Sequence, residues 1–273
     1  PDRPVGRKQV LTPSPVKAFA AEKQIPVFQY EKIRKEGVGD LRALAPDLMI
    51  TCAFGQILSQ EILDIPKFGV VNVHASLLPK YRGSAPIQWS VLNGDAGTGV
   101  TIMQLDEGLD TGDILLVEPI AIDPEETSGQ LFDRVTAVGA RVLCETLPAI
   151  AAGTLKAEPQ AHENASTAPM LSKEMAQFKL TDSAAHIHNW VRGMNPWPMA
   201  FFMHDGKKIK VTASKLSENP ANAAPGSVLT VKPLTIACQD DAIVLDSVTP
   251  EGGKSMAGTA WAAGRRLKAG DSL

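Results

Sequence analysis

Gly69-Val-Val-Asn-Val-His-Ala-Ser-Leu-Leu-Pro-Lys-Tyr-Arg-Gly83 joins a strand pattern to several polar side chains in this 273-residue chain. Its first part, residues 69–73, is short and β-branched, which is typical of a strand. Side chains alternate along a strand, so Asn72 and His74 project from one face while the neighbouring valines enter the other. An amide donor and a titratable imidazole therefore lie side by side at the end of a strand, and we expect both to be functional.

The sequence on either side of this stretch alternates strand and helix patterns up to about residue 150. Residues 48–53 (LMITCA) form a continuous apolar run, typical of a strand covered on both faces. Thr127-Ser-Gly-Gln130 is a capping box that precedes the longest apolar helical face. We therefore predict an α/β domain with a Rossmann-like, mainly parallel sheet, whose ligands bind at the carboxyl ends of strands. The other expected elements are helices at 14–23, in the second half of 32–45, at 59–64 and at 84–93, and strands at 25–28, 98–104 and 114–122.

The rest of the chain has a different pattern. Residues 154–175 are small and polar without periodicity, which predicts a linker. Beyond a helix at 182–193, short β-like runs separated by turn residues predict a small barrel or sandwich. We expect an N-terminally incomplete first domain over 1–153, the linker at 154–175 and a second domain over 176–273. The β-like runs are 199–203, 207–213, 227–231, 234–238 and 242–247.

Composition excludes several classes of protein. Hydrophobic residues are 44% and charged residues 21%, so a disordered or fibrous chain is excluded. No run approaches 18 apolar residues and the first twenty residues lack the core of a secretory signal, so we expect a cytoplasmic protein without membrane association. The three cysteines lie far apart in apolar surroundings, which predicts buried thiols and no metal site. Residues 172–273 carry 12 Lys and Arg against 9 Asp and Glu, which fits either a solvated surface or an anionic partner.

An acidic loop between two expected strands is the second candidate for chemistry. Leu105-Asp-Glu-Gly-Leu-Asp-Thr-Gly-Asp113 contains four carboxylates and two glycines. Its spacing does not match a calcium-binding loop. We expect one carboxylate to lie beside His74, and on spacing alone either Asp106 or Asp110 could do so.

These motifs resemble the family of formyltransferases that use 10-formyltetrahydrofolate, and the resemblance covers essentially the whole chain. It rests on Asn72-Val-His74, Ser76-Leu-Leu-Pro79, Tyr81-Arg-Gly83 and Asp106-Glu-Gly-Leu-Asp110-Thr-Gly. Two further stretches are similar to the branch of the family that acts on initiator methionyl-tRNA. They are Pro1-Asp-Arg-Pro-Val-Gly-Arg7 with Leu11-Thr-Pro-Ser-Pro-Val-Lys17, and Asn195-Pro-Trp-Pro-Met199.

The resemblance implies a reaction and a set of site residues. A formyl group would move from the folate to the α-amine of methionine on initiator methionyl-tRNA, through a tetrahedral oxyanion and without a metal. The second domain would be an oligonucleotide-binding-type (OB-like) barrel, and we expect a monomer. Asn72, His74 and Asp110 would be catalytic, and Ser76, Leu77, Leu78 and Pro79 would line the folate site. The tRNA would be contacted by Arg7, Lys8, Lys207, Lys208, Lys210, Arg265 and Arg266.

The main alternative is a folate-dependent formyltransferase acting on a small amine, such as glycinamide ribonucleotide or an amino-sugar nucleotide. The basic loop over residues 1–17 argues against it, because a small substrate needs no long cationic arm. A hydrolase that releases formate from the folate and a catalytically inactive RNA-binding protein are further alternatives. Family members also carry a strand, a glycine-containing turn and a helix ahead of this loop, so we expect the first strand of the sheet to be missing from this sequence.

Overall fold

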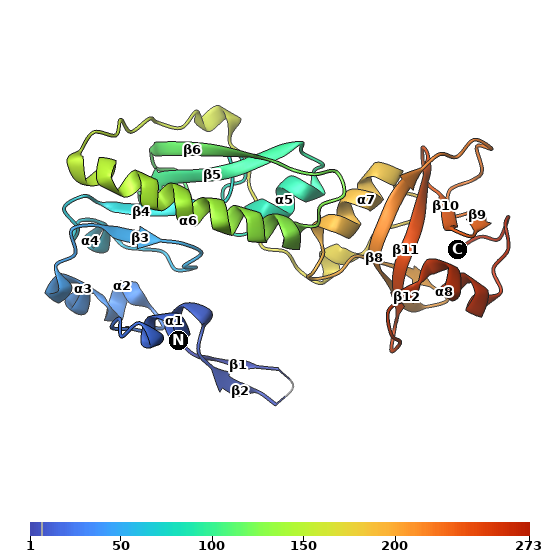
Figure 1. The fold of residues 1–273 in the computed structure, drawn as a ribbon, viewed down its shortest axis with the longest axis horizontal. Coiled ribbons are helices and arrows are strands. Elements are labelled where there is room, and N and C mark those ends of the chain that lie inside the picture. The colour runs from blue at the N-terminus through green and yellow to red at the C-terminus, as the bar shows by residue number, and fades with distance from the viewer. Residues whose placement is uncertain (7) are drawn as a thin grey trace.

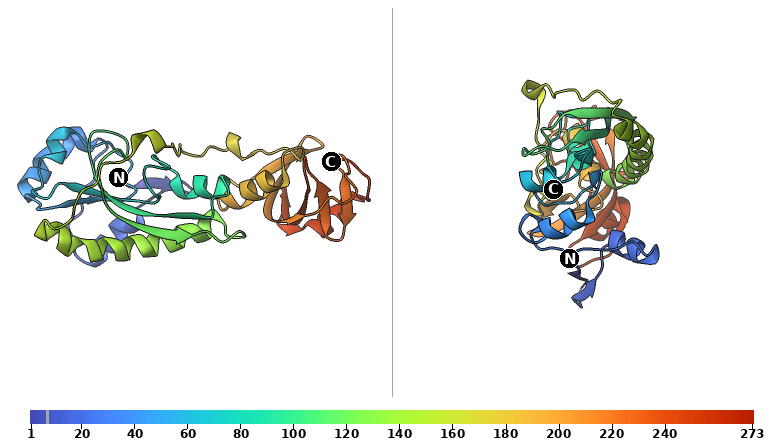
Figure 2. Two further views of the ribbon diagram at one scale, coloured as in Figure 1. Left: turned by 90° about the horizontal axis from the view of Figure 1, so that it is seen from above. Right: turned by 90° about the vertical axis from the view of Figure 1, so that its left-hand side faces the viewer.

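The computed structural model describes residues 1–6 and 8–273, and its two parts lie end to end along the longest axis (Figures 1 and 2). Helices and strands alternate through the first part, as the sequence patterns predict. Its elements are β1 (Arg3–Val5), β2 (Val10–Thr12), α1 (Pro15–Glu22), α2 (Ile33–Glu36), α3 (Val38–Leu44), β3 (Met49–Thr51), α4 (Gln60–Leu63), β4 (Val70–His74), α5 (Pro86–Leu92), β5 (Gly97–Gln104), β6 (Ile114–Ala121) and α6 (Ser128–Ala152).

Local capping interactions set the starts of α1 and α6, two of the predicted helices. Ser14 Oγ accepts a hydrogen bond from the backbone N–H of Lys17, which caps α1. Thr127 and Gln130 form the expected reciprocal capping box at the start of α6. The α6 helix ends at Gly153, which has a φ of 64°, a backbone conformation that glycine adopts without strain.

The sheet of the first part has the strand order β3-β4-β5-β6. Strands β3 and β4 are parallel, whereas β4 with β5 and β5 with β6 are antiparallel. The α/β class is confirmed, but the described sheet is mixed and not mainly parallel. The connection from β5 to β6 is the acidic loop, which contains no crossover helix to return the chain for a parallel pairing.

Helices cover both faces of this sheet. On one face, Leu131 and Val135 of α6 pack with Val100 and Ile102 of β5. On the other face, Ile62 of α4 belongs to a smaller apolar cluster. The length and composition of α6 alone would also suit a membrane span, but its buried residues belong to the core beside the sheet (Figure 1).

Two expectations about this part are wrong. Residues 25–28 form no strand, because no neighbouring described strand pairs with them. Cys52 and Cys144 are exposed, and only Cys238 is a buried thiol. Cys52 follows the edge strand β3. Cys144 lies two residues after the buried Val142 on α6, so its side chain points away from the buried face of the helix.

The second part is an antiparallel sheet packed against helices. Its strand order is β7-β8-β11-β10-β9, with β12 paired to β11, so the described ladders leave β7 and β9 as edges. Its core includes Ile209, Ile236 and Leu245, together with Trp261 from a helix that the sequence patterns did not predict. This arrangement agrees with an OB-like β domain. The elements are α7 (Ala184–Gly193), β7 (Phe201–His204), β8 (Lys207–Ser217), β9 (Val228–Val231), β10 (Leu234–Ala237), β11 (Ala242–Pro250), β12 (Met256–Ala257) and α8 (Gly258–Arg265).

The segment between the two parts runs along the first part and pairs with it (Figure 2). It contains two short 3₁₀ turns, η1 (His162–Asn164) and η2 (Glu174–Ala176). Glu158 forms a β-bridge with Ile114, and Thr167 forms one with Arg82. The segment therefore contacts the loop that follows β4 and the start of β6, and is more than a spacer.

Candidate active site

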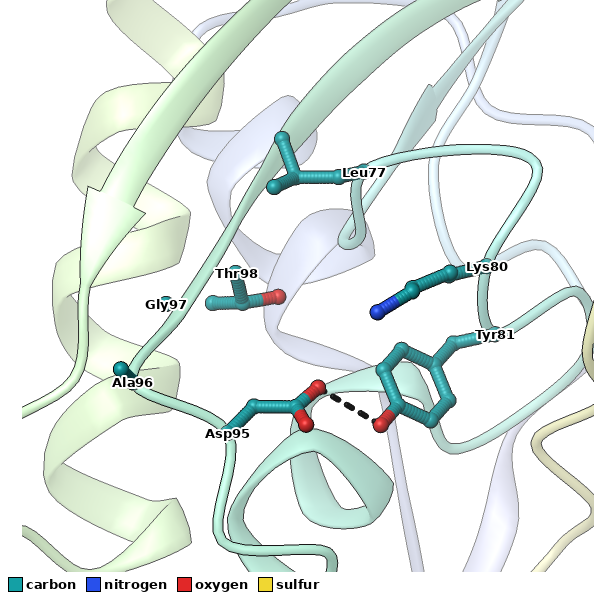
Figure 3. Close-up of a pocket in the computed structure, with 7 residues that line it drawn as sticks. All are labelled: Leu77, Lys80, Tyr81, Asp95, Ala96, Gly97 and Thr98. Carbon is teal, nitrogen blue, oxygen red and sulfur yellow. Dashed lines mark hydrogen bonds between the residues drawn. The ribbon is translucent and has the colours of Figure 1, made fainter. Parts of the chain in front are cut away.

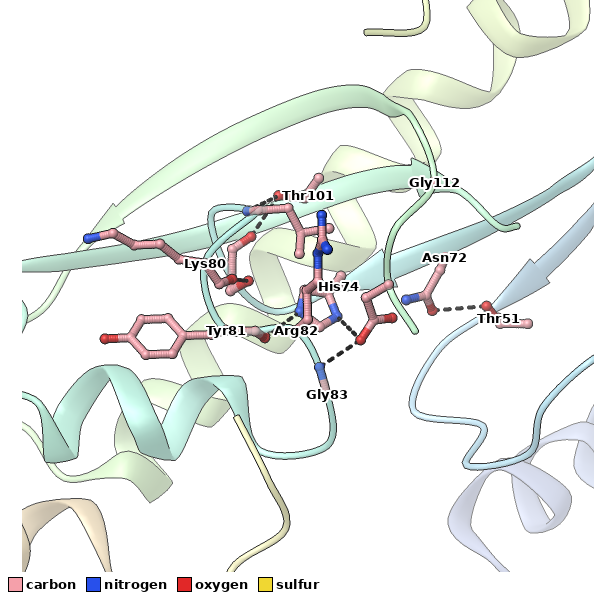
Figure 4. A network of polar contacts seen from close by, with 12 residues as sticks. Thr51, Asn72, His74, Lys80, Tyr81, Arg82, Gly83, Thr101 and Gly112 are labelled. Atoms are coloured by element: carbon pink, nitrogen blue, oxygen red, sulfur yellow. Dashed lines mark hydrogen bonds and ion pairs between the residues drawn. The ribbon is translucent and has the colours of Figure 1, made fainter. Parts of the chain in front are cut away.

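The end of β4 carries the polar pair that the strand pattern predicts. His74 is buried, with 5% of its surface exposed, and Asn72 is half-buried two residues earlier on the same strand. The Nε2 atom of His74 lies 3.0 Å from the carbonyl oxygen of Tyr81 (Figure 4). Its Nδ1 atom lies 3.7 Å from Oδ2 of Asp110. The two ring nitrogens therefore face different partners.

Asp110, and not Asp106, is the carboxylate that faces His74. Its Oδ2 accepts a hydrogen bond of 2.7 Å from the backbone N–H of Gly83, which orients it toward the imidazole. The backbone of Asp110 has a φ of 52°, in the left-handed region that aspartate tolerates better than most residues. Asp106 accepts hydrogen bonds from Gly108 and Thr111 within its own loop, so it stabilises the loop.

The amide of Asn72 is oriented by a residue of the neighbouring strand. The hydroxyl of Thr51 on β3 donates a 2.9 Å hydrogen bond to Oδ1 of Asn72 (Figure 4). The Nδ2 group has no hydrogen-bond partner among the residues that the structure describes, and so it can donate to a carbonyl oxygen that enters the site.

The loop after β4 is held by its own backbone and by Thr101 of β5. Ser76 is fully buried and its hydroxyl donates to the carbonyl of Lys80. The hydroxyl of Thr101 donates to the carbonyl of Ser76 and accepts from the N–H of Leu78. The Ser76 and Leu78 side chains are thus buried within the loop, whereas Leu77 lines a cavity. Pro79 is half-buried in the same loop.

This cavity has a volume of about 250 Å³, and Leu77, Lys80, Tyr81 and Asp95 contribute to its wall (Figure 3). The hydroxyl of Tyr81 donates a 2.6 Å hydrogen bond to Asp95. Burial, and then this hydrogen bond, raise the pKa of Tyr81 to about 12. Asn72, His74 and Asp110 do not line the cavity, but Tyr81 connects the two places because its backbone carbonyl faces His74.

The basic residues predicted to bind tRNA are spread over two surfaces. Arg7 lies outside the described residues, and Lys8 is exposed in the turn between β1 and β2. In the second part, Lys207, Lys208 and Lys210 are exposed on β8, with the amine of Lys208 placed 4.7 Å from the ring centroid of Phe201. Arg265 and Arg266 are also exposed at the end of α8, and Arg265 lies 3.8 Å from Asp205.

Sequence patterns did not identify three residues that support the site. Thr51 and Gln160 carry no local signal, because their partners lie on other elements. Tyr81 belongs to a quoted motif, but its contact with His74 was not predicted. Among residues 1–6 and 8–273, no group of three or more His, Cys, Asp or Glu side chains could hold a metal ion.

Comparison with known proteins extends these observations to a family. Residues 1–147 match the family model described as formyl transferase, and residues 170–266 match the formyl transferase C-terminal domain. The chain therefore belongs to the formyl transferase family.

Within this family, curated relatives point to one branch. The chain is 44% identical to the methionyl-tRNA formyltransferase of Acetivibrio thermocellus over 100% of this chain and 89% of that protein. It is 43% identical to the methionyl-tRNA formyltransferase of Bacillus subtilis, over 100% and 87% of the two chains. The solved N-formyltransferase of Helicobacter canadensis, in complex with folinic acid and dTDP-3-aminofucose, has the same fold. It has a TM-score of 0.65 and 19% identity, covering 89% of this chain and 85% of that chain.

Proposed function

We propose that this chain transfers the formyl group of 10-formyltetrahydrofolate to the α-amine of methionine on initiator methionyl-tRNA. The observation that carries the proposal is the convergence of Asn72, His74 and Asp110 at the end of β4 in a chain 41–44% identical to methionyl-tRNA formyltransferases. In the same proposal the catalytic domain spans 1–153, the linker 154–175 and the tRNA-binding domain 176–273. The protein would act in the cytoplasm as a monomer.

The chemistry needs a donor to the formyl oxygen and a group that moves a proton. The amine nitrogen attacks the formyl carbon, the bond from that carbon to N10 of the folate breaks, and the proton that the amine loses ends on N10. The Nδ2 group of Asn72, which has no partner among the described residues, would stabilise the tetrahedral oxyanion, and a donor of this kind typically contributes ~3 kcal/mol. His74 would accept and return the proton at Nδ1, beside Asp110.

The folate and the tRNA would use different surfaces. We assign Ser76, Leu77, Leu78 and Pro79 to the folate site, where the buried Ser76 and Leu78 hold the loop that presents its neighbours. The exposed basic residues, together with Arg7, would contact tRNA phosphates. Those described are Lys8, Lys207, Lys208, Lys210, Arg265 and Arg266.

A formylation assay tests the proposed function directly. Purified protein is given 10-formyltetrahydrofolate with either charged initiator tRNA, glycinamide ribonucleotide or an amino-sugar nucleotide. We expect formyl transfer to the charged tRNA and none to the two small amines. Transfer to a small amine alone would overturn the proposal, and release of formate without any acceptor would indicate a hydrolase.

A further inference from the structure

The segment between the two parts contributes a buried amide to the candidate active site. Gln160 has 5% of its surface exposed, although its neighbours at 158, 159 and 161 are exposed. A glutamine side chain has two donor hydrogens and one acceptor oxygen, and burying it is unfavourable unless these are paired. The side chain of Gln160 therefore has its partners at the place where it is buried.

The partners of Gln160 come from both loops that form the site. Its Nε2 group donates to the carbonyl of Asp110 at 3.0 Å and to the carbonyl of Gly112 at 2.7 Å. Its Oε1 atom accepts from Nε and Nη2 of Arg82 at 3.1 and 2.6 Å. Two carbonyls on one side and a guanidinium on the other allow a single orientation of the amide.

The geometry points to Gln160 as the residue that positions Asp110 against His74, an inference that rests on the proposed function. The backbone of Asp110 has a positive φ. This conformation costs free energy, so it persists only where contacts with other residues hold the backbone in place. Gln160 holds the Asp110 carbonyl, while Gly83 holds its carboxylate. These two contacts fix the backbone and the side chain of one residue, 3.7 Å from the imidazole.

The donor hydrogens of Gln160, and not its contact with Arg82, carry this role. Gln160→Glu keeps an oxygen for Arg82 but replaces the donor with a second oxygen that faces two carbonyls. Gln160→Met has a similar length and no hydrogen-bonding group of comparable strength. Both changes remove the hold on Asp110, so we expect both to lower kcat about 10-fold or more with little change in either KM, because small misplacements of a reacting group have large effects.

A second measurement needs no catalysis. The N–H of Gly83 donates to the Asp110 carboxylate, so its hydrogen exchange, followed by NMR, reports where that carboxylate lies. We expect exchange at Gly83 to accelerate about 10-fold or more in both variants. The control is Val142→Ala, which removes a buried methyl pair of α6 in the sheet core and lowers the unfolding temperature without touching either loop.

Each outcome of these experiments decides the inference. Faster Gly83 exchange and lower kcat in both Gln160 variants, with neither in Val142→Ala, support it. Normal kcat and normal Gly83 exchange in the Gln160 variants overturn it, as does a loss confined to Gln160→Met, which would place the effect on Arg82. A wild-type protein that does not formylate charged tRNA would refute the proposed function, while Gly83 exchange would still decide whether Gln160 positions Asp110.

Discussion

The Nε2 atom of His74 lies 3.0 Å from the carbonyl oxygen of Tyr81. A carbonyl oxygen can only accept a hydrogen bond, so Nε2 carries the hydrogen. In the neutral imidazole this leaves Nδ1, the nitrogen that faces Asp110, without a hydrogen. A buried backbone contact thus selects the tautomer in which the free lone pair points toward the carboxylate.

Replacing His74 or Asn72 by alanine should remove catalysis and leave the fold largely intact. We expect His74→Ala and Asn72→Ala each to lower kcat by ~100-fold or more, because one loses the proton-transfer group and the other the oxyanion donor. Single-turnover formylation and thermal unfolding, measured together, test this. Losses of activity that only parallel losses of folded protein would mean that the two side chains are structural.

Thr51 should affect catalysis through the orientation of Asn72. Thr51→Val removes the hydroxyl that donates to Oδ1 of Asn72, so the amide can rotate and its donor is no longer fixed. We expect kcat to fall about 5-fold, since a positioned hydrogen bond is typically worth ~1 kcal/mol. Thr51→Ser keeps the hydroxyl and should retain most of the activity. Equal rates for the two variants would contradict this orientation role.

The stability of the protein should depend on pH through Tyr81. Burial and the bond to Asp95 raise the pKa of Tyr81 to about 12 in the folded protein, from a usual value near 10. Its contribution to the free energy of unfolding is therefore complete below about pH 10 and is lost as the pH rises toward about 12. Denaturant unfolding measured from pH 10 to 12 tests this. We expect the free energy of unfolding to fall more for the wild-type protein than for Tyr81→Phe over this interval.

Tyr30, the other tyrosine of the chain, adds its own pH dependence to this measurement. It is half-buried, and its hydrogen bond to Asp40 raises its pKa to about 12 as well. Tyr30→Phe should remove only the loss of stability that Tyr30 itself causes and retain the loss that Tyr81 causes. If Tyr81→Phe and the wild-type protein had parallel stability curves from pH 10 to 12, Tyr81 would not be buried as a neutral phenol.

Removing basic side chains should weaken tRNA use without changing folate use. We expect Arg7→Ala and, on β8, Lys210→Ala to raise KM for charged tRNA. Each should also lower the slope of log KM against log salt concentration by about one for each phosphate contact that is lost. The KM for the folate should stay constant. Kinetics with each substrate varied at several salt concentrations test this, and unchanged tRNA parameters for Arg7→Ala would remove the first loop from tRNA recognition.

The three cysteines should differ in reactivity. Burial raises the pKa of Cys238 to about 12, whereas Cys52 and Cys144 are exposed. Because the thiolate is the reactive form, iodoacetamide near pH 8 should label Cys52 and Cys144 in the native protein and Cys238 only after denaturation. Mass spectrometry of the labelled peptides gives the answer, and native labelling of Cys238 would contradict its burial.

Local periodicity was enough to predict the elements that carry the site. The alternation of Asn72 and His74 with valines placed both side chains on one face of β4, and the capping box at Thr127 located the start of α6. These predictions depend on residues within a few positions of one another, whose spacing sets which face of a strand or helix they occupy.

Residue spacing left open which carboxylate faces His74; the family resemblance implied Asp110, and the folded structure shows that it faces the imidazole and how it is held. Asp106 and Asp110 are equivalent by spacing, and the choice depends on Gly83, 27 positions from Asp110, and on Gln160, 50 positions away. The mixed direction of the sheet and the role of the segment after α6 also arise from pairing between distant residues. Such contacts form only when the chain has folded, and no local repeat encodes them.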